Sequence, residues 1–299
     1  MANFFLQCNV LLARLLLAAT LFAGVAAITP IANAQRDPIR ITHGPMLGAP
    51  ASDGVTVWAR TSDAGNFSVR YGTQPGRLDR VGPIGETILG NDNTGVVRLQ
   101  DLAPDTRYHY QVFVNDRPQG LPGTFRTLPS AAASRNAKHN PDGRFNFRFQ
   151  IGSCANQNPL HGIGHQAPTY ETLNRDWADK VHFHVMNGDW LYEELRDYPP
   201  QAWQLVQGLT PQQMPRSVSV MPTIAGVWEN YKLYLSRGNS LAKWHRNMPS
   251  YFTFDDHELV NDIWGSSEAG KRHRRTVFRD IGTHAWMNYL GWANPFAYN

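Results

Sequence analysis

The pattern of apolar and polar residues changes part-way along the chain, and this change most constrains the fold. Within residues 39–128, short runs of alternating apolar and polar residues, such as 67–71 and 108–114, are separated by turn residues. Such runs without helical periodicity predict an all-β sandwich. Within residues 145–299, strand-like runs alternate with helical stretches, such as 224–244, which predicts a layered α/β sheet. Residues 129–144 are small, polar and interrupted by Pro and Gly, and we predict that they form the linker.

The N-terminus is predicted to carry a secretory signal peptide, residues 1–34. Residues 10–28 are almost wholly apolar, and Ala32-Asn33-Ala34 follows them as a small-residue cleavage site. The alternative is an uncleaved membrane anchor, because about 20 apolar residues are enough to span a bilayer. The signal-peptide interpretation predicts an exported protein, either periplasmic, on the cell surface or secreted, with no stable membrane anchor after cleavage.

The composition excludes several classes of protein. Hydrophobic residues make up 42% of the chain and charged residues 17%, which excludes a disordered chain. The net charge of +4 is a small excess without a basic stripe, so no specific nucleic-acid binding is expected. Two cysteines exclude a disulfide-stapled scaffold. Signal cleavage would remove Cys8 and leave Cys154 as a buried small hydrophobe, a reactive thiol or a metal ligand.

Polar residues of metal-ligand types follow three of the strands expected in the second region. They are Cys154, Asp189 with Tyr192, and Asp256 with His257. Taken singly, each has a structural explanation: a core cysteine, a turn aspartate, a packing tyrosine or an acidic helix N-terminus. Together they predict one site, because open α/β sheets bind ligands at the carboxyl ends of their strands. Polar groups beside apolar strands also cost free energy unless they are paired or coordinated.

These residue types indicate hydrolysis of a phosphate ester at a metal site. Carboxylates suit calcium and other divalent ions, whereas thiolate and phenolate favour a more polarising ion such as ferric iron or zinc. Metal ions held by a bridging carboxylate supply a hydroxide nucleophile and positive charge for the phosphoryl oxygens. Asp189 is placed to bridge the ions, and His257 is placed to donate a proton or to bind the phosphate.

Four segments resemble motifs of one known family, the PhoD-like alkaline phosphatases, a branch of the metallophosphatases. They are DGVTVWAR at residues 53–60, FRFQIGSCANQ around Cys154, GDWLYEE around Asp189 and FDDHELVND around Asp256. The resemblance extends over residues 39–299. It implies a fibronectin-like domain followed by a metallophosphatase domain, ferric iron (Fe³⁺) with calcium, and hydrolysis of phosphate mono- or diesters at alkaline pH.

The same resemblance implies a role for each site residue. Cys154 corresponds to a metal-binding thiolate, Asp189 to the bridging ligand and Tyr192 to a phenolate ligand. Asp256 stands in the place of the Asn or Asp ligand of a Gly-Asn-His-Glu motif, with His257 beside it as the catalytic group. Asp189 and His257 are therefore the expected catalytic residues, and Cys154, Asp189, Tyr192 and Asp256 the expected metal ligands.

A second resemblance concerns the first region. Residues 102–108 resemble the corner sequence that leads into a late strand of fibronectin type III-like domains, with Tyr108 as the corner tyrosine. The expected architecture is therefore a fibronectin type III/Ig-like sandwich at 39–128, followed by an α/β metallophosphatase-type layered sheet at 145–299.

The chain departs from the family pattern on its C-terminal side. Metallophosphatases carry further histidine-bearing motifs, and nothing after Asp262 resembles them. The basic run at 271–275 is expected to be a solvated helix face. We therefore expect residues 145–299 to be an incomplete metallophosphatase domain that binds metal poorly by itself. The alternatives are an inactive or truncated exported binding protein, and a phosphodiesterase, nuclease or metallo-lyase on the same fold.

Overall fold

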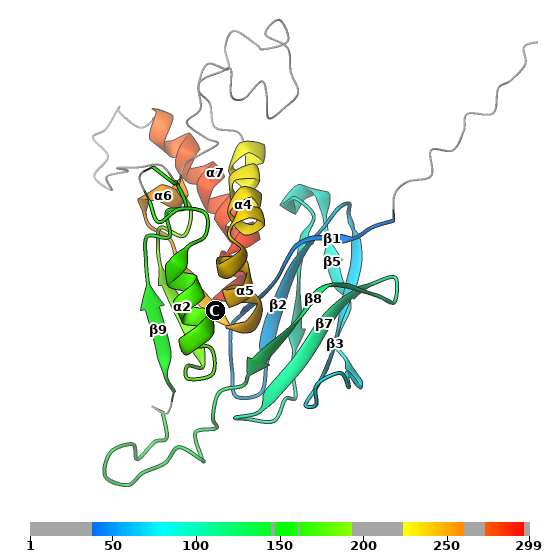
Figure 1. Ribbon diagram of the computed structural model, residues 1–299, viewed down its shortest axis with the longest axis vertical. Helices are drawn as coiled ribbons and strands as arrows, with labels where there is room; N and C mark the ends of the chain where they lie inside the picture. The colour runs from blue at the N-terminus through cyan, green and yellow to red at the C-terminus, as the bar shows by residue number, and fades with distance from the viewer. Residues whose placement is uncertain (1–37, 145–146, 161, 193–223, 260–272, 296–299) are drawn as a thin grey trace, which may run out of the picture. The chain divides into compact units, whose positions relative to one another are not determined.

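The computed structural model describes residues 38–144, 147–160, 162–192, 224–259 and 273–295 (Figure 1). The chain divides into two compact units, Met1–Pro38 and Ile39–Asn299, and nearly all of the first lies outside the described residues. The predicted signal peptide therefore lies outside them as well. Within the described ranges, no helix is both long and apolar enough to span a membrane.

A six-stranded mixed sheet runs through the second unit, in the order β6-β2-β1-β11-β10-β9. Its strands are β1 (Ile41–Gly48), β2 (Val55–Thr61), β6 (Thr94–Leu99), β9 (Phe149–Gly152), β10 (Phe183–Asn187) and β11 (Ser250–Thr253). β6, β2 and β1 pair antiparallel, whereas β9, β10 and β11 pair parallel. β1 and β11 join these two parts through a parallel register pair, Gly48 with Ser250. Strands from both predicted regions thus belong to one sheet, and their division into domains stays a prediction.

A five-stranded sheet completes the N-terminal part. Its strands are β3 (Gly65–Gly72), β4 (Arg80–Val81), β5 (Gly85–Thr87), β7 (Arg107–Val114) and β8 (Arg117–Arg126). The alternation that predicted β3 places Phe67, Val69 and Tyr71 in a core shared with β2 and β6 of the other sheet. Tyr108 is buried, and its hydroxyl accepts a hydrogen bond from the Ala103 N–H at 2.8 Å. A hydroxyl bonded back to the chain a few residues upstream is the arrangement expected of a corner tyrosine.

Helices of the second part form a separate core on the parallel strands. They are α2 (Pro168–Asp176), α4 (Ile224–Arg237), α5 (Asn239–Asn247), α6 (Asp256–Leu259) and α7 (His273–Tyr289), with the short 3₁₀ helix η3 (Gly291–Ala293). Another 3₁₀ helix, η1 (Leu89–Asn91), lies between β5 and β6. α2 packs on α5, and α4 packs on α7 (Figure 1). Tyr170 of α2 and Trp244 of α5 are buried with Met186 of β10 and Phe252 of β11. The parallel strands are therefore supported by helices close to the ends where the predicted site lies.

The helical stretch predicted over residues 224–244 is two helices rather than one. α4 ends at Arg237 and α5 begins at Asn239, so the break falls at Gly238. A side chain at Gly238 would meet the Tyr234 carbonyl oxygen at 2.7 Å and the Gln157 side-chain nitrogen at 2.5 Å. The close approach of these two groups leaves room only for glycine, which has a low helix propensity.

Candidate metal centre

The predicted site residues lie just beyond the carboxyl ends of the three parallel strands. Cys154 lies two residues beyond the end of β9, and Asp189 two residues beyond the end of β10. Tyr192 follows on the same loop as Asp189. After β11, Asp256 and His257 begin the helix α6. Because neighbouring parallel strands end at the same edge of a sheet, these three loops converge there.

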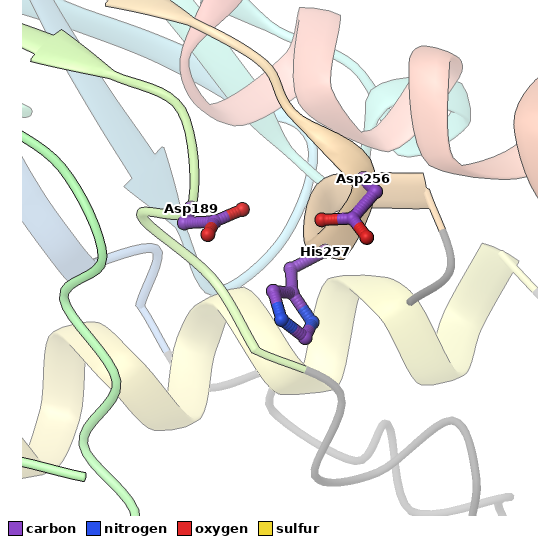
Figure 2. Close-up of side chains that lie close together, drawn as sticks. All are labelled: Asp189, Asp256 and His257. Carbon is purple, nitrogen blue, oxygen red and sulfur yellow. The ribbon is translucent and has the colours of Figure 1, made fainter. Parts of the chain in front are cut away.

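Asp189 lies at the centre of the cluster. Asp189, Asp256 and His257 each offer one ligand atom, and these atoms lie within 4.8 Å of one another (Figure 2). The Cys154 thiol donates a hydrogen bond to Asp189 Oδ2 at 3.4 Å, and the Tyr192 hydroxyl donates one to the same oxygen at 3.1 Å. The ring centroids of Tyr192 and His257 are 3.9 Å apart. The structure therefore brings together all five residues that the sequence singled out.

The backbone of the cluster is in an unfavourable conformation at two of these residues. Cys154 has a φ of 60° and Asp189 a φ of 56°, in the left-handed region. This conformation costs a non-glycine residue about 1–2 kcal/mol, and residues that adopt it concentrate at functional sites. Gly188, with a φ of 78°, precedes Asp189, and a Cβ there would lie 2.6 Å from the Cβ of Asp255. The loops that carry Asp189 and Asp256 thus approach each other closely at Gly188.

A polar atom without a partner supports a metal ion at this cluster. Asp189 is 9% exposed, and its Oδ1 is buried and has no hydrogen-bond partner among the described residues. Leaving a buried acceptor without a partner costs about 1–3 kcal/mol, and more for a charged group. A cation would provide that partner. Two carboxylates, an imidazole, a phenol and a thiol are all metal-ligand types, so the residues present fit a metal ion.

The protonation of Tyr192 depends on its surroundings in this cluster. Burial, the hydrogen bond with Cys154 and the negative charge of Asp189 all raise the pKa of Tyr192 above its usual range. Tyr192 is therefore a neutral phenol when only protein surrounds it, and it donates its proton to Asp189. A bound cation has the opposite effect, because it lowers the pKa of an acid that coordinates it. A proton and a metal ion thus compete for the Tyr192 oxygen.

Glu258 is a residue to which the sequence analysis gave no role. It is fully buried, and its carboxylate accepts hydrogen bonds from the backbone N–H groups of Asp189, Trp190, Leu191 and Asp255. Burial raises the pKa of Glu258 to about 7, while these four hydrogen bonds act to lower it. The sequence offered one signal for this residue, an acidic side chain directly after the histidine of the third motif.

Two buried histidines lie beneath the Asp189 loop. Trp190 donates from its ring N–H to His245 Nε2 at 3.0 Å, and His245 Nδ1 lies 2.9 Å from Ser250 Oγ. The ring of His184 lies 5.7 Å from that of His245, between centroids. Burial lowers the pKa of His184 to about 3, and burial together with His184 lowers that of His245 well below its usual value. Both rings are therefore neutral at pH 7.

We expect His184→Gln to reduce the loss of stability that accompanies acidification. Between pH 7 and pH 5, the unfolded chain protonates a histidine whose pKa is about 6.5, whereas folded His184 stays neutral. Proton uptake by the unfolded chain alone therefore favours unfolding as the pH falls. Through His184, it lowers the free energy of unfolding by about 2 kcal/mol between pH 7 and pH 5. The groups packed around the ring are Gln150, Tyr170, Trp244 and His245.

The measurement is urea unfolding of both proteins at pH 7 and pH 5. Glu258 acts in the opposite direction over this range, because its raised pKa favours the folded state as the pH falls. Because Glu258 is present in both wild type and His184→Gln, its contribution cancels when their free energies of unfolding are subtracted. The exposed His284 of α7 supplies the control, and His284→Gln should leave the pH dependence unchanged. Equal losses of stability in wild type and His184→Gln would contradict the prediction.

Comparison with known families identifies the protein's relatives. The family model for the PhoD-like phosphatase matches residues 149–297, and the model for the N-terminal domain of PhoD-like phosphatases matches residues 26–129. The chain belongs to the PhoD-like phosphatase family. All five residues of the cluster lie within the first of these matches.

Two solved structures share the fold of this PhoD-like phosphatase. A structure of PhoD is 18% identical, with a TM-score of 0.60, and the match covers 83% of this chain and 45% of that chain. Purple acid phosphatase PPD1 from yellow lupin (Lupinus luteus) seeds is 14% identical, with a TM-score of 0.50, and the match covers 82% of this chain and 40% of that one. The chain therefore spans less than half the length of either structure. No curated protein matches it.

These similarities confirm the predicted resemblance and the coarser part of the predicted fold. The PhoD-like phosphatase has a mixed sheet with helices, and its solved neighbours are PhoD and a purple acid phosphatase. The segment after Asp262, in which no further histidine-bearing motif of the family was found, lies partly outside the described residues, which omit 260–272 and 296–299. The basic run at 271–275 also lies partly outside them, and the helix α7 begins at His273.

Proposed function

We propose that this chain carries the metal centre of an exported phosphoric ester hydrolase, a PhoD-like alkaline phosphatase. Its substrate would be a small phosphate monoester or phosphodiester, hydrolysed at alkaline pH. One observation carries the proposal. The buried Asp189 Oδ1 has no hydrogen-bond partner among the described residues and lies within a cluster of ligand-type residues at the strand ends of a PhoD-like phosphatase. Ferric iron with calcium is the proposed metal content, and other divalent ions would suit the carboxylates as well.

The proposed ligands are Cys154, Asp189, Tyr192 and Asp256. Bound metal ions would supply a hydroxide nucleophile and positive charge for the phosphoryl oxygens. Asp189 has one oxygen facing Cys154 and Tyr192 and a second oxygen without a protein partner among the described residues. A carboxylate whose two oxygens face different groups can serve as a ligand shared between two ions. Asp189 is therefore proposed to hold ions on both sides of its carboxylate.

His257 is proposed as the residue that moves a proton or holds the phosphate. Its ring lies against that of Tyr192, and one of its ring nitrogens lies within 4.8 Å of the carboxylates of Asp189 and Asp256. From this position it can donate a proton to the leaving oxygen of the ester, which is the usual work of a histidine general acid. Its neighbours also explain why activity should rise at alkaline pH. Tyr192 and Cys154 bind a metal ion only after they lose their protons, so metal affinity increases with pH.

The rest of the chain has proposed roles that follow from its sequence. Residues 39–128 would be a fibronectin type III-like module, and the corner arrangement of Tyr108 with Ala103 supports this assignment. Residues 129–144 would be the linker to the metallophosphatase domain. The apolar run and small-residue site within 1–34 support export to the periplasm, the cell surface or the medium.

The test of this proposal is the metal content of the purified protein. We expect iron and calcium by elemental analysis, with an absorption band from charge transfer between a tyrosinate and ferric iron. Cys154→Ala should weaken metal binding by about 10–100-fold, which is the typical effect even of residues that only support metal ligands. Exposed Ser153 lies beside Cys154 in the sequence, so Ser153→Ala is the matched control and should keep the metal.

Two chromogenic substrates complete this experiment. Hydrolysis of p-nitrophenyl phosphate would indicate a phosphomonoesterase, and preference for bis(p-nitrophenyl) phosphate a phosphodiesterase. A protein that holds no metal and hydrolyses neither substrate would contradict the proposal for this chain and leave two alternatives, an incomplete metallophosphatase domain or an exported binding protein.

A further inference from the structure

Glu258 connects two of the three loops that carry the proposed metal ligands, those after β10 and β11. Its Oε1 accepts hydrogen bonds from the Trp190 N–H at 2.6 Å and the Leu191 N–H at 3.2 Å. Its Oε2 accepts hydrogen bonds from the Asp189 N–H at 3.0 Å and the Asp255 N–H at 2.8 Å. Three of these four donors belong to the loop after β10, whereas Glu258 itself lies on α6 after β11. The carboxylate therefore bridges two loops that are far apart in the sequence.

A simpler role would be to cap the N-terminus of α6. Only the Asp255 N–H belongs to that terminus, and its hydrogen bond to Glu258 spans three residues. The bonds to Asp189, Trp190 and Leu191 span 67 to 69 residues and contribute nothing to capping α6. Three of the four hydrogen bonds that Glu258 accepts from these described residues therefore fix the loop that carries Asp189.

That loop needs an external support. Asp189 has a left-handed backbone, and the neighbouring Gly188 lies against Asp255. Consecutive N–H groups that turn toward one point form a cradle for an anion, and here a side chain of the same protein fills the cradle. Without a carboxylate, three successive N–H groups of the loop would lose their acceptor. The loop would then be free to leave the conformation that directs Asp189 toward Asp256 and His257.

We propose that Glu258 is a positioning residue for the metal centre: its carboxylate fixes the Asp189 loop in the conformation that binds the ion. The part of this inference that concerns the ion rests on the proposed function. The part that concerns the loop can be tested in the metal-free protein.

The test is Glu258→Gln in the full chain. Glutamine keeps the size of the side chain, but its amide places donor hydrogens opposite two of the backbone N–H groups. We expect amide hydrogen exchange in peptides that cover residues 187–192 to become about 10–100-fold faster in the metal-free protein. Exchange at residues 67–71 of the sandwich should not change. With Mn²⁺ as the probe, affinity should fall by about 10–100-fold, as for other residues that support metal ligands.

Exposed Glu86 of β5 supplies the matched control, and Glu86→Gln should change neither readout. Unchanged exchange at 187–192 in Glu258→Gln would overturn the inference. Equally faster exchange at 67–71 would also overturn it, because Glu258 would then act on overall stability rather than on the loop. If wild type binds neither Mn²⁺ nor iron with calcium while exchange at 187–192 still accelerates in the variant, the proposed function fails and the role of Glu258 in fixing the loop stands.

Discussion

Asp92→Asn is expected to lower the free energy of unfolding by about 3 kcal/mol, because it removes one partner of a buried ion pair. Asp92 Oδ1 accepts a hydrogen bond from Arg60 at 2.9 Å, and the two side chains are only 11% and 12% exposed. Asp92 Oδ2 accepts hydrogen bonds from Arg60 at 3.1 Å and from the Tyr289 hydroxyl at 2.5 Å. The Lys232 ammonium lies 3.4 Å from the same oxygen.

These partners come from separate parts of the fold. Arg60 lies on β2, Lys232 on α4 and Tyr289 on α7, so Asp92 joins the antiparallel part of the six-stranded sheet to two helices. Burial alone would raise the pKa of Asp92, but the hydrogen bonds from Arg60 and Tyr289 and the charge of Lys232 hold it below its usual range. Asp92 is therefore ionised at neutral pH, and neutral Asn would leave the Arg60 charge without its partner.

The matched control for this prediction is Asp116→Asn. Asp116 also has a left-handed backbone, with a φ of 60°, and it also pairs with an arginine, Arg70, at 2.7 Å. Its side chain is 89% exposed, and exposed pairs contribute about 0–1 kcal/mol. Because asparagine tolerates the left-handed conformation, both substitutions leave the backbone unstrained. Urea unfolding at pH 7.5 compares the two variants. Equal losses of stability would show that the buried Asp92 pair contributes no more to the free energy of unfolding than the exposed Asp116 pair.

Local patterns in the sequence were sufficient to place most of the strands. The alternation in residues 67–71 and 108–114 depends only on which face of a strand is buried, and both runs lie within strands of the structure. The pairing of β1 with β11 could not be predicted from the sequence. It depends on contacts between residues about 200 positions apart, and no local pattern records which strand edges meet. The break at Gly238 was missed for a similar reason, because the group that crowds it belongs to Gln157.

The site residues could be singled out from the sequence because each side chain is itself the chemical group. A thiol, a phenol, carboxylates and an imidazole at strand ends are unusual whatever surrounds them. Glu258 and Asp92 differ in this respect. Glu258 acts through backbone N–H groups up to 69 residues away, and Asp92 through side chains from three other elements. The third motif shows an acidic side chain at position 258, but backbone donors and distant partners leave no mark on the local sequence, so the roles of Glu258 and Asp92 become visible only in the folded chain.

Asp189→Asn is expected to have opposite effects on the metal-free and the metal-bound protein. In the metal-free protein, the buried Asp189 Oδ1 lacks a partner among the described residues and carries charge, which destabilises the fold. Neutral Asn removes that charge and tolerates the left-handed backbone of this position. The Asn amide would still lack a partner at that position, so the substitution removes only the excess cost of a charged over a neutral unsatisfied group, and we expect the metal-free variant to be about 1 kcal/mol more stable than wild type.

The metal-bound state should respond in the other direction. At about 1,000 times its dissociation constant, an ion that binds only the folded state adds about 4 kcal/mol to the free energy of unfolding. Asp189→Asn should lose this increment, because an amide is a poor substitute for a carboxylate ligand, and hydrolysis should fall by at least about 100-fold, the upper effect of residues that only support metal ligands. Urea unfolding with and without metal, together with the hydrolysis rate, measures both effects.

Exposed Asp255 lies near the cluster, and Asp255→Asn makes the same change in charge as a control. A variant that keeps its metal-dependent stability would show that Asp189 does not bridge the ions. If the metal-free variant proved less stable than wild type, the Asp189 carboxylate would have to stabilise the fold even without an ion.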